Sequence, residues 1–146
     1  MMSKASSRML DLALEATPGA VPEAHRAVSA VAAAGGANGD DLGRISLAVS
    51  EAVTNAVVHA YGDSPAGSIQ LLAAAVEGEL SVLVADDGCG LGQAPHSLGL
   101  GLGMGVIEYS VDSLAITTRA SGGTSVEMRF SLSEQKPKAA RAALAT

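Results

Sequence analysis

The stretch from Leu47 to Tyr61 places a carboxylate, an amide and an imidazole at intervals of four residues. On a helix, Glu51, Asn55 and His59 would stack along one face. Such groups on an otherwise apolar helix cost desolvation free energy unless a partner or ligand satisfies them. Glutamate and asparagine also supply the hard oxygen ligands that Mg²⁺ takes, directly or through water. The row is therefore either a solvated rim or the lining of a site, and two glycine clusters downstream favour a site.

The first cluster, Asp86-x-Gly88-x-Gly90, begins where a predicted strand ends. Aspartate and glycine are common turn formers, so an ordinary turn is one interpretation. The functional interpretation is that a buried Asp86 accepts a hydrogen bond from the amino group of a base, while the glycines allow the backbone to approach it closely.

The second cluster, Gly99-x-Gly101-x-Gly103-x-Gly105, comes directly before a predicted helix. Successive backbone N–H groups at the start of a helix form a cradle for anions. The spacing is neither that of a Walker A loop nor that of a Rossmann fingerprint. Because the net charge is −6 and no lysine lies nearby, a phosphate site here would depend on backbone dipoles and Mg²⁺.

These residues need a framework, which hydropathy periodicity and turn signals predict. Apolar residues at helical spacing (Val49, Ala52, Val53, Ala56, Val57 and Ala60) indicate that the central helix is buried on one side. Asp40 or Asp41 is expected to cap this helix. The expected elements are a strand over 9–16, helices over 22–34 and about 40–61, a hairpin of strands over 68–76 and 79–85, a helix over 106–111, and strands over 113–118 and 125–132. This order predicts an α+β two-layer sandwich, with helices on one face of a mixed, mostly antiparallel sheet. We expect one domain over residues 1–132 and a loose tail over 133–146.

Composition narrows the function classes. The chain has 146 residues, 48% hydrophobic but only 2% aromatic, so the core must consist of small aliphatic side chains. No apolar run reaches the length of about 20 residues that a spanning helix needs, and Asp11 interrupts any signal-peptide core, so we expect a cytoplasmic protein that does not enter membranes. The acidic balance argues against binding to nucleic acid. The single cysteine, Cys89, excludes an internal disulfide and is interpreted as a small filler.

Taken in order, the motifs resemble those of the GHKL (Bergerat-fold) ATPase family. Glu51-x-x-x-Asn55 resembles its N box, and Asp86-x-Gly88-x-Gly90 its G1 box. Gly101-x-Gly103 resembles the G2 box and Gly123-Thr124 the G3 position. Within that family, the sequences of residues 51–61 and 101–112 are most similar to those of bacterial anti-sigma factor serine/threonine kinases. The resemblance extends from about residue 9 to residue 132.

The resemblance implies ATP and Mg²⁺ as cofactors and a role for each matched position. Asn55 would coordinate Mg²⁺, and Glu51 would act as general base toward the attacking hydroxyl, or orient it. Asp86 would bind the adenine amino group, with Thr124 supporting the base through a water. Gly88, Gly90, Gly101 and Gly103 would shape the nucleotide pocket. His59 either faces that pocket or is a histidine satisfied at the helix end. Arg26 lies where the family often meets protein partners, but a solvated arginine is the simpler interpretation.

The implied activity is phosphorylation of an anti-anti-sigma protein of the STAS type by a homodimeric kinase, which otherwise sequesters a sigma factor. Three alternatives stay open. The chain could be a nucleotide-dependent binding module without kinase activity, a switch-type kinase acting on stressosome-like scaffold proteins, or the ATP-binding part of a histidine kinase. The last is the least favoured, since no phosphoacceptor helix precedes the domain. The segment over 91–98 has no Lys or Arg, which leaves nucleotide binding intact but questions the transfer step.

Overall fold

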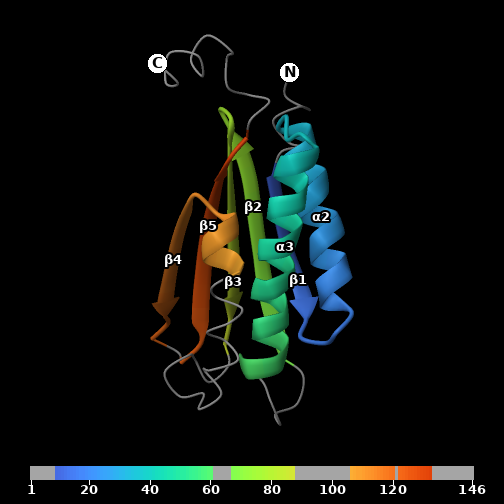
Figure 1. The fold of residues 1–146 in the computed structure, drawn as a ribbon. Coiled ribbons are helices and arrows are strands. Elements are labelled where there is room, and N and C mark those ends of the chain that lie inside the picture. The colour runs from blue at the N-terminus through green and yellow to red at the C-terminus, as the bar shows by residue number, and fades with distance from the viewer. Residues whose placement is uncertain (1–8, 61–66, 88–105, 121, 133–146) are drawn as a thin grey trace.

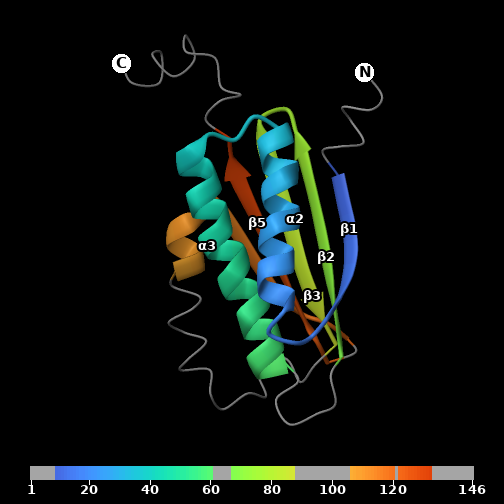
Figure 2. The same cartoon turned by 90° about the vertical axis from the view of Figure 1, so that its right-hand side faces the viewer.

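The computed structural model describes residues 9–60, 67–87, 106–120 and 122–132, without the side chains of residues 59 and 60. Five strands form one sheet: β1 (Met9–Glu15), β2 (Ser68–Val76), β3 (Glu79–Asp86), β4 (Ser113–Thr118) and β5 (Thr124–Ser131). Their order is β1-β2-β3-β5-β4, and each neighbouring pair is antiparallel. Helices α2 (Ala20–Ala34) and α3 (Gly39–Asn55) pack side by side on one face (Figure 1, Figure 2). The predicted two-layer α+β sandwich is therefore confirmed.

The strand hairpin forms where the sequence predicts it. Glu77 and Gly78 join β2 to β3 with φ angles of 49° and 81°, and Val76 pairs with Glu79 across the turn. Two central residues with positive φ define a type I′ turn, whose twist matches that of the flanking strands. This turn fixes the β2–β3 register and, with it, which side chains of β3 face the helices.

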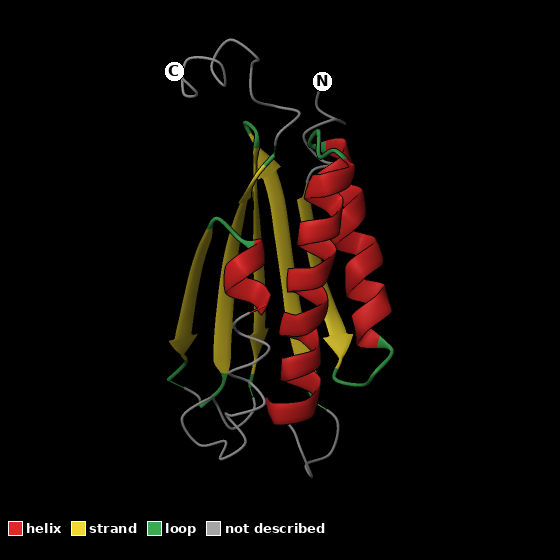
Figure 3. Ribbon diagram, in the orientation of Figure 1, coloured by secondary structure: helices red, strands yellow, loops and turns green. Residues whose placement is uncertain are grey.

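Strand alternation divides the sheet into a helix-covered face and an open face. The covered face holds the core, which among the described residues is aliphatic apart from Phe130 and Met128. Helix α2 contributes the buried residues Ala20, Ala24, Val28, Val31 and Ala32, which recur at helical spacing. Figure 3 shows the helices gathered on one side of the strands.

The start of α3 differs from the prediction. Asn38, and neither Asp40 nor Asp41, is the N-cap: its side chain accepts a hydrogen bond from the Asp41 N–H at 2.8 Å. The Asp41 carboxylate in turn accepts from the Asn38 N–H at 3.1 Å, which completes a capping box. The predicted caps were therefore wrong, because the helix begins at Gly39, one residue before Asp40, and Asp41 occupies the N3 position of the capping box. Similarly, α2 begins at Ala20, so that Pro22 lies in its first turn.

The end of the long helix also differs from a regular α-helix. After Asn55 the chain continues as a wider, π-helical turn, η1 (Ala56–Ala60). Single π-helical turns within α-helices are rare and are frequent at functional sites. The turn follows directly on Asn55, so the change of helical pitch coincides with a predicted site residue.

Candidate functional site

The end of β3 and the start of β5 bring Asp86 and Thr124 together. Ala85 pairs with Ser125 in the register, so Asp86 lies opposite Thr124. Both residues alternate in phase with the buried apolar residues of their strands and are themselves 5% and 6% exposed. The Thr124 N–H donates a hydrogen bond to Asp86 Oδ1 at 3.3 Å. A buried carboxylate thus lies on the helix-covered face, beside the threonine that the family resemblance also assigns to binding of the base.

The approach of the two strands here is unusually close. A Cβ atom on Gly123 would lie 1.8 Å from the carbonyl oxygen of Asp86 and 2.6 Å from its carbonyl carbon. No side chain fits in that space, so only glycine can occupy position 123 without moving the backbone. The Gly123-Thr124 pair, expected from sequence as the G3 position, therefore has a steric reason for its glycine.

Glu51 and Asn55 lie one turn apart near the end of α3, and both are half-buried. Asn55 Nδ2 is buried and has no hydrogen-bond partner among the residues that the structure describes. Leaving such a donor without a partner costs about 1–3 kcal/mol, so a buried amide in this state calls for a partner such as a ligand or a water. The Asn55 side chain therefore fits the part expected of it, in which Oδ1 would bind Mg²⁺ and Nδ2 would face the nucleotide side.

The two halves of the site share one end of the molecule. Helix α3 runs toward the end of the sheet where β3 finishes and β5 begins (Figure 1), and both α3 and η1 contact β3. The polar residues Glu51 and Asn55 come from the helical layer, and Asp86 and Thr124 from the sheet. This arrangement can hold a base on the sheet and phosphates near the helix.

The structure does not describe all of the predicted site residues. Gly88, Gly90, Gly101 and Gly103 lie outside the described residues, as does the His59 side chain. Within the described part of the chain, no group of three or more His, Cys, Asp and Glu side chains gathers as a metal site would. In the same part, no helix is long and apolar enough to cross a bilayer.

Sequence reasoning missed two arginines that organise the surroundings. Arg119 contacts the end of β3, donating from Nη1 to the Asp86 carbonyl oxygen and to Asp87 Oδ1, each at 2.9 Å. The Arg44 side chain on α3 donates hydrogen bonds to the carbonyl oxygens of Ser110 and Ser131, each at 3.0 Å. It also forms an ion pair with the buried Asp41 at 3.2 Å. A lone arginine just before the Gly122-Gly123-Thr124 turn was the available signal for Arg119.

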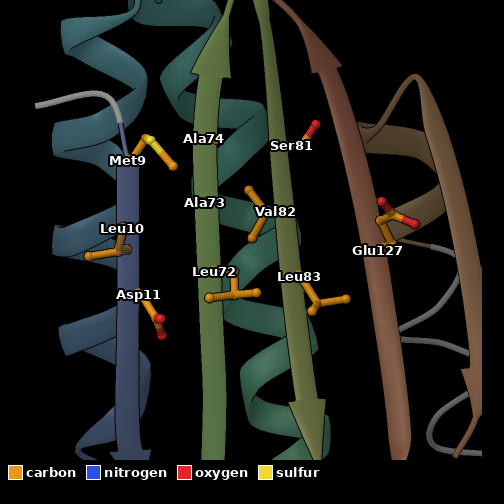
Figure 4. Close-up of a pocket in the computed structure, with 10 residues that line it drawn as sticks. All are labelled: Met9, Leu10, Asp11, Leu72, Ala73, Ala74, Ser81, Val82, Leu83 and Glu127. Atoms are coloured by element: carbon orange, nitrogen blue, oxygen red, sulfur yellow. The ribbon is translucent and has the colours of Figure 1, made fainter. Parts of the chain in front are cut away.

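A groove on the open face of the sheet is separate from this site. It has a volume of about 640 Å³ and lies over β1, β2 and β3, with Leu72, Leu83 and Ser81 in its floor and Asp11 and Glu127 at its sides (Figure 4). None of the predicted nucleotide-binding residues lines it. The site built by α3, β3 and β5 is on the other face.

Comparison with known proteins agrees with this geometry. The model of the histidine kinase-like ATPase domain matches residues 14–130. The anti-sigma F factor of Oceanobacillus iheyensis is 30% identical over 108 residues, which are 66% of this chain and 74% of that protein. The anti-sigma F factor of Clostridium novyi is 28% identical over 104 residues, 64% of this chain and 73% of the relative.

A solved structure gives the same result. The RsbU and RsbW domains of Rv1364c from Mycobacterium tuberculosis superpose with a TM-score of 0.65 at 28% identity, over 85% of this chain and 32% of that one. The chain thus spans about a third of that larger protein. The resemblance inferred from the four motifs, to GHKL ATPases and to anti-sigma factors among them, is confirmed.

Proposed function

Because this chain belongs to the histidine kinase-like ATPase domain family, we propose that it binds ATP and Mg²⁺ between α3 and the sheet and transfers the γ-phosphoryl group to a protein serine or threonine. The acceptor is an anti-anti-sigma protein of the STAS type. The same domain, as a homodimer in the cytoplasm, sequesters a sigma factor. Two relatives named anti-sigma F factor support this choice of partners.

The observation that carries the proposal is the Asn55 amide, whose buried nitrogen has no partner in the described residues. It lies at the end of α3, one turn from Glu51, and α3 contacts the strand that ends in the buried Asp86. Asn55 Oδ1 would hold Mg²⁺, which when bound neutralises phosphate charge. Asp86 would accept a hydrogen bond from the adenine amino group, and Thr124 would support the base.

Glu51 acts on the acceptor in this scheme. Its carboxylate takes the proton of the acceptor hydroxyl as the oxygen attacks the γ-phosphorus. The bond from that phosphorus to the β,γ-bridging oxygen breaks, and ADP leaves with the electron pair. Since phosphoryl transfer needs mainly positioning and charge neutralisation, a half-buried carboxylate one turn from the metal ligand is suitably placed.

The test is transfer of label from γ-labelled ATP to purified STAS proteins, with Glu51→Gln and Asn55→Ala compared with the original chain. Glu51→Gln should keep Mg²⁺·ATP binding and lose labelling, whereas Asn55→Ala should lose both. Glu127→Gln is the matched control, because Glu127 lies on the open face of the sheet. Labelling that persists in Glu51→Gln would remove the general base from the scheme.

The second candidate is a nucleotide-dependent binding module without transfer. It is favoured by the sequence of residues 91–98, which holds no Lys or Arg to neutralise a γ-phosphate. The two candidates separate in the same assay. A module would bind ATP in an Asn55-dependent manner and would label none of the STAS proteins.

A further inference from the structure

Arg119 links two segments that must stay in register for base recognition. Its backbone closes the turn between β4 and β5: the Arg119 N–H donates to the Gly123 carbonyl at 2.7 Å, and the Gly122 N–H donates to the Arg119 carbonyl at 2.9 Å. Its side chain reaches across to β3, where Nη1 donates to the Asp86 carbonyl and to Asp87 Oδ1. One residue therefore joins the turn that carries Gly123 and Thr124 to the strand end that carries Asp86.

The bonds from Arg119 go to the main chain of Asp86 and to its neighbour. The Asp86 carboxylate instead accepts from the Thr124 N–H. Asp86 is the last residue of β3, where it pairs with Ile69 of β2, and its carbonyl accepts the bond from Arg119 at this strand end. Hydrogen bonds from an ionised donor are roughly twice as strong as those between neutral groups. The guanidinium thus holds the backbone from which the Asp86 side chain projects.

We propose that Arg119 is a positioning residue for recognition of the purine 6-amino group, acting by fixing the Asp86 main chain against the Gly123-Thr124 turn. This inference rests on the proposed function, in which Asp86 accepts a hydrogen bond from adenine. Arg119 does not contact the nucleotide in this scheme. Its effect reaches the base through the direction of the Asp86 carboxylate.

Loss of the Arg119 side chain should affect recognition of the adenine amino group selectively. If the Asp86 backbone loses its anchor, the carboxylate no longer meets the amino group with good geometry, and that single hydrogen bond weakens. The proposed contacts of Asn55 with Mg²⁺ and the phosphates should change less, because they come from α3 and not from this strand end. Loss of Arg119 should therefore weaken binding of ATP but leave unchanged the binding of a purine nucleotide without the 6-amino group.

The experiment measures the affinities of ATP and of purine riboside triphosphate, which lacks that amino group, for the full chain and its variants. Arg119→Gln should weaken the binding of ATP about tenfold, equivalent to about 1.4 kcal/mol. It should leave the affinity for the analogue unchanged. Arg119→Lys, which keeps a charged donor, should recover part of the loss. Arg129→Gln is the matched control, since Arg129 pairs with Glu127 at 3.6 Å on β5 and is half-exposed.

Asp86→Ala supplies the reference that separates the two proposals. If Asp86→Ala selectively weakens the binding of ATP and Arg119→Gln does not, Asp86 binds the adenine amino group without help from Arg119. The inference is then overturned. If Arg119→Gln weakens both nucleotides equally, Arg119 is a general structural residue and the inference is again overturned. If the original chain binds neither nucleotide, the proposed function fails and the inference fails with it.

Discussion

Replacing Gly123 with alanine should weaken nucleotide binding more than replacing any other described glycine with alanine. The added Cβ would lie 1.8 Å from the Asp86 carbonyl oxygen and 2.7 Å from Asp87 Cα, both of them backbone atoms. Real Cβ contacts essentially never fall below 3.0 Å. Since neither atom belongs to a flexible side chain, β3 and β5 must separate at their shared end.

The size of the effect follows from what that separation breaks. Overpacking of a well-packed site costs about 1–3 kcal/mol, which for a domain of this length lowers the melting temperature by about 2–12 °C. Moving Asp86 also removes its bond to adenine. A hydrogen bond to a charged group contributes about 1.5–3 kcal/mol, so affinity for ATP should fall roughly tenfold to hundredfold.

The assay is calorimetric titration of ATP with Mg²⁺, together with thermal unfolding of the same preparations. Gly43→Ala makes the identical chemical change inside α3, where a Cβ would meet nothing within 4 Å. It should raise stability by about 0.5–1 kcal/mol, because alanine is the better helix former, and leave ATP affinity unchanged. If Gly123→Ala bound ATP as tightly as Gly43→Ala, the close approach of the strands would not be what positions Asp86.

The other predictions concern α3 and its contacts. Asn55→Ala should not lower the melting temperature, because the amide nitrogen has no partner to lose in the described residues, and should abolish the stabilisation that Mg²⁺·ATP gives in a thermal shift assay. Arg44→Ala should lower the free energy of unfolding by about 2–4 kcal/mol in urea titration, since it removes bonds to two carbonyls and the buried Asp41; Arg44→Lys should recover less than half, because one ammonium cannot span these acceptors. Asn38→Ala should cost about 1 kcal/mol in the same measurement through loss of the cap, and Asp40→Ala should cost less.

Local patterns predicted the framework well because burial sets them. The stripe of Val49, Ala52 and Val53 and the inward residues of α2 lie in the core as expected, since the helical period leaves few ways to hide so many aliphatic groups. The Glu77-Gly78 turn was equally readable, because two-residue hairpin turns demand residues that tolerate positive φ. The positions of these helices and strands along the chain therefore follow from local sequence patterns.

Contacts between distant segments could not be predicted in the same way. The carbonyl groups that the Arg44 side chain contacts are 66 and 87 residues away, and the partners of the Arg119 side chain are 32 and 33 residues away. Neither distance repeats at a helical or strand period, so only the strand order and register bring the groups together. The π-helical turn after Asn55 is a further example, because the sequence Ala-Val-Val-His-Ala reads as ordinary α-helix.

Binding and transfer draw on different parts of this chain. Asp86 and Thr124 are placed by the register of β3 and β5, and Asn55 by the last α-helical turn of α3, so the groups proposed for adenine and metal are fixed by the core itself. Neutralising charge on the transferred phosphoryl group is a separate demand, which arises only in the transition state. Residues 91–98 contain no Lys or Arg to meet it, so in the proposed scheme transfer would depend on Mg²⁺ and on backbone N–H groups. Tight ATP binding with slow transfer would therefore be the natural behaviour of this fold with this sequence, and it would require no defect in the site.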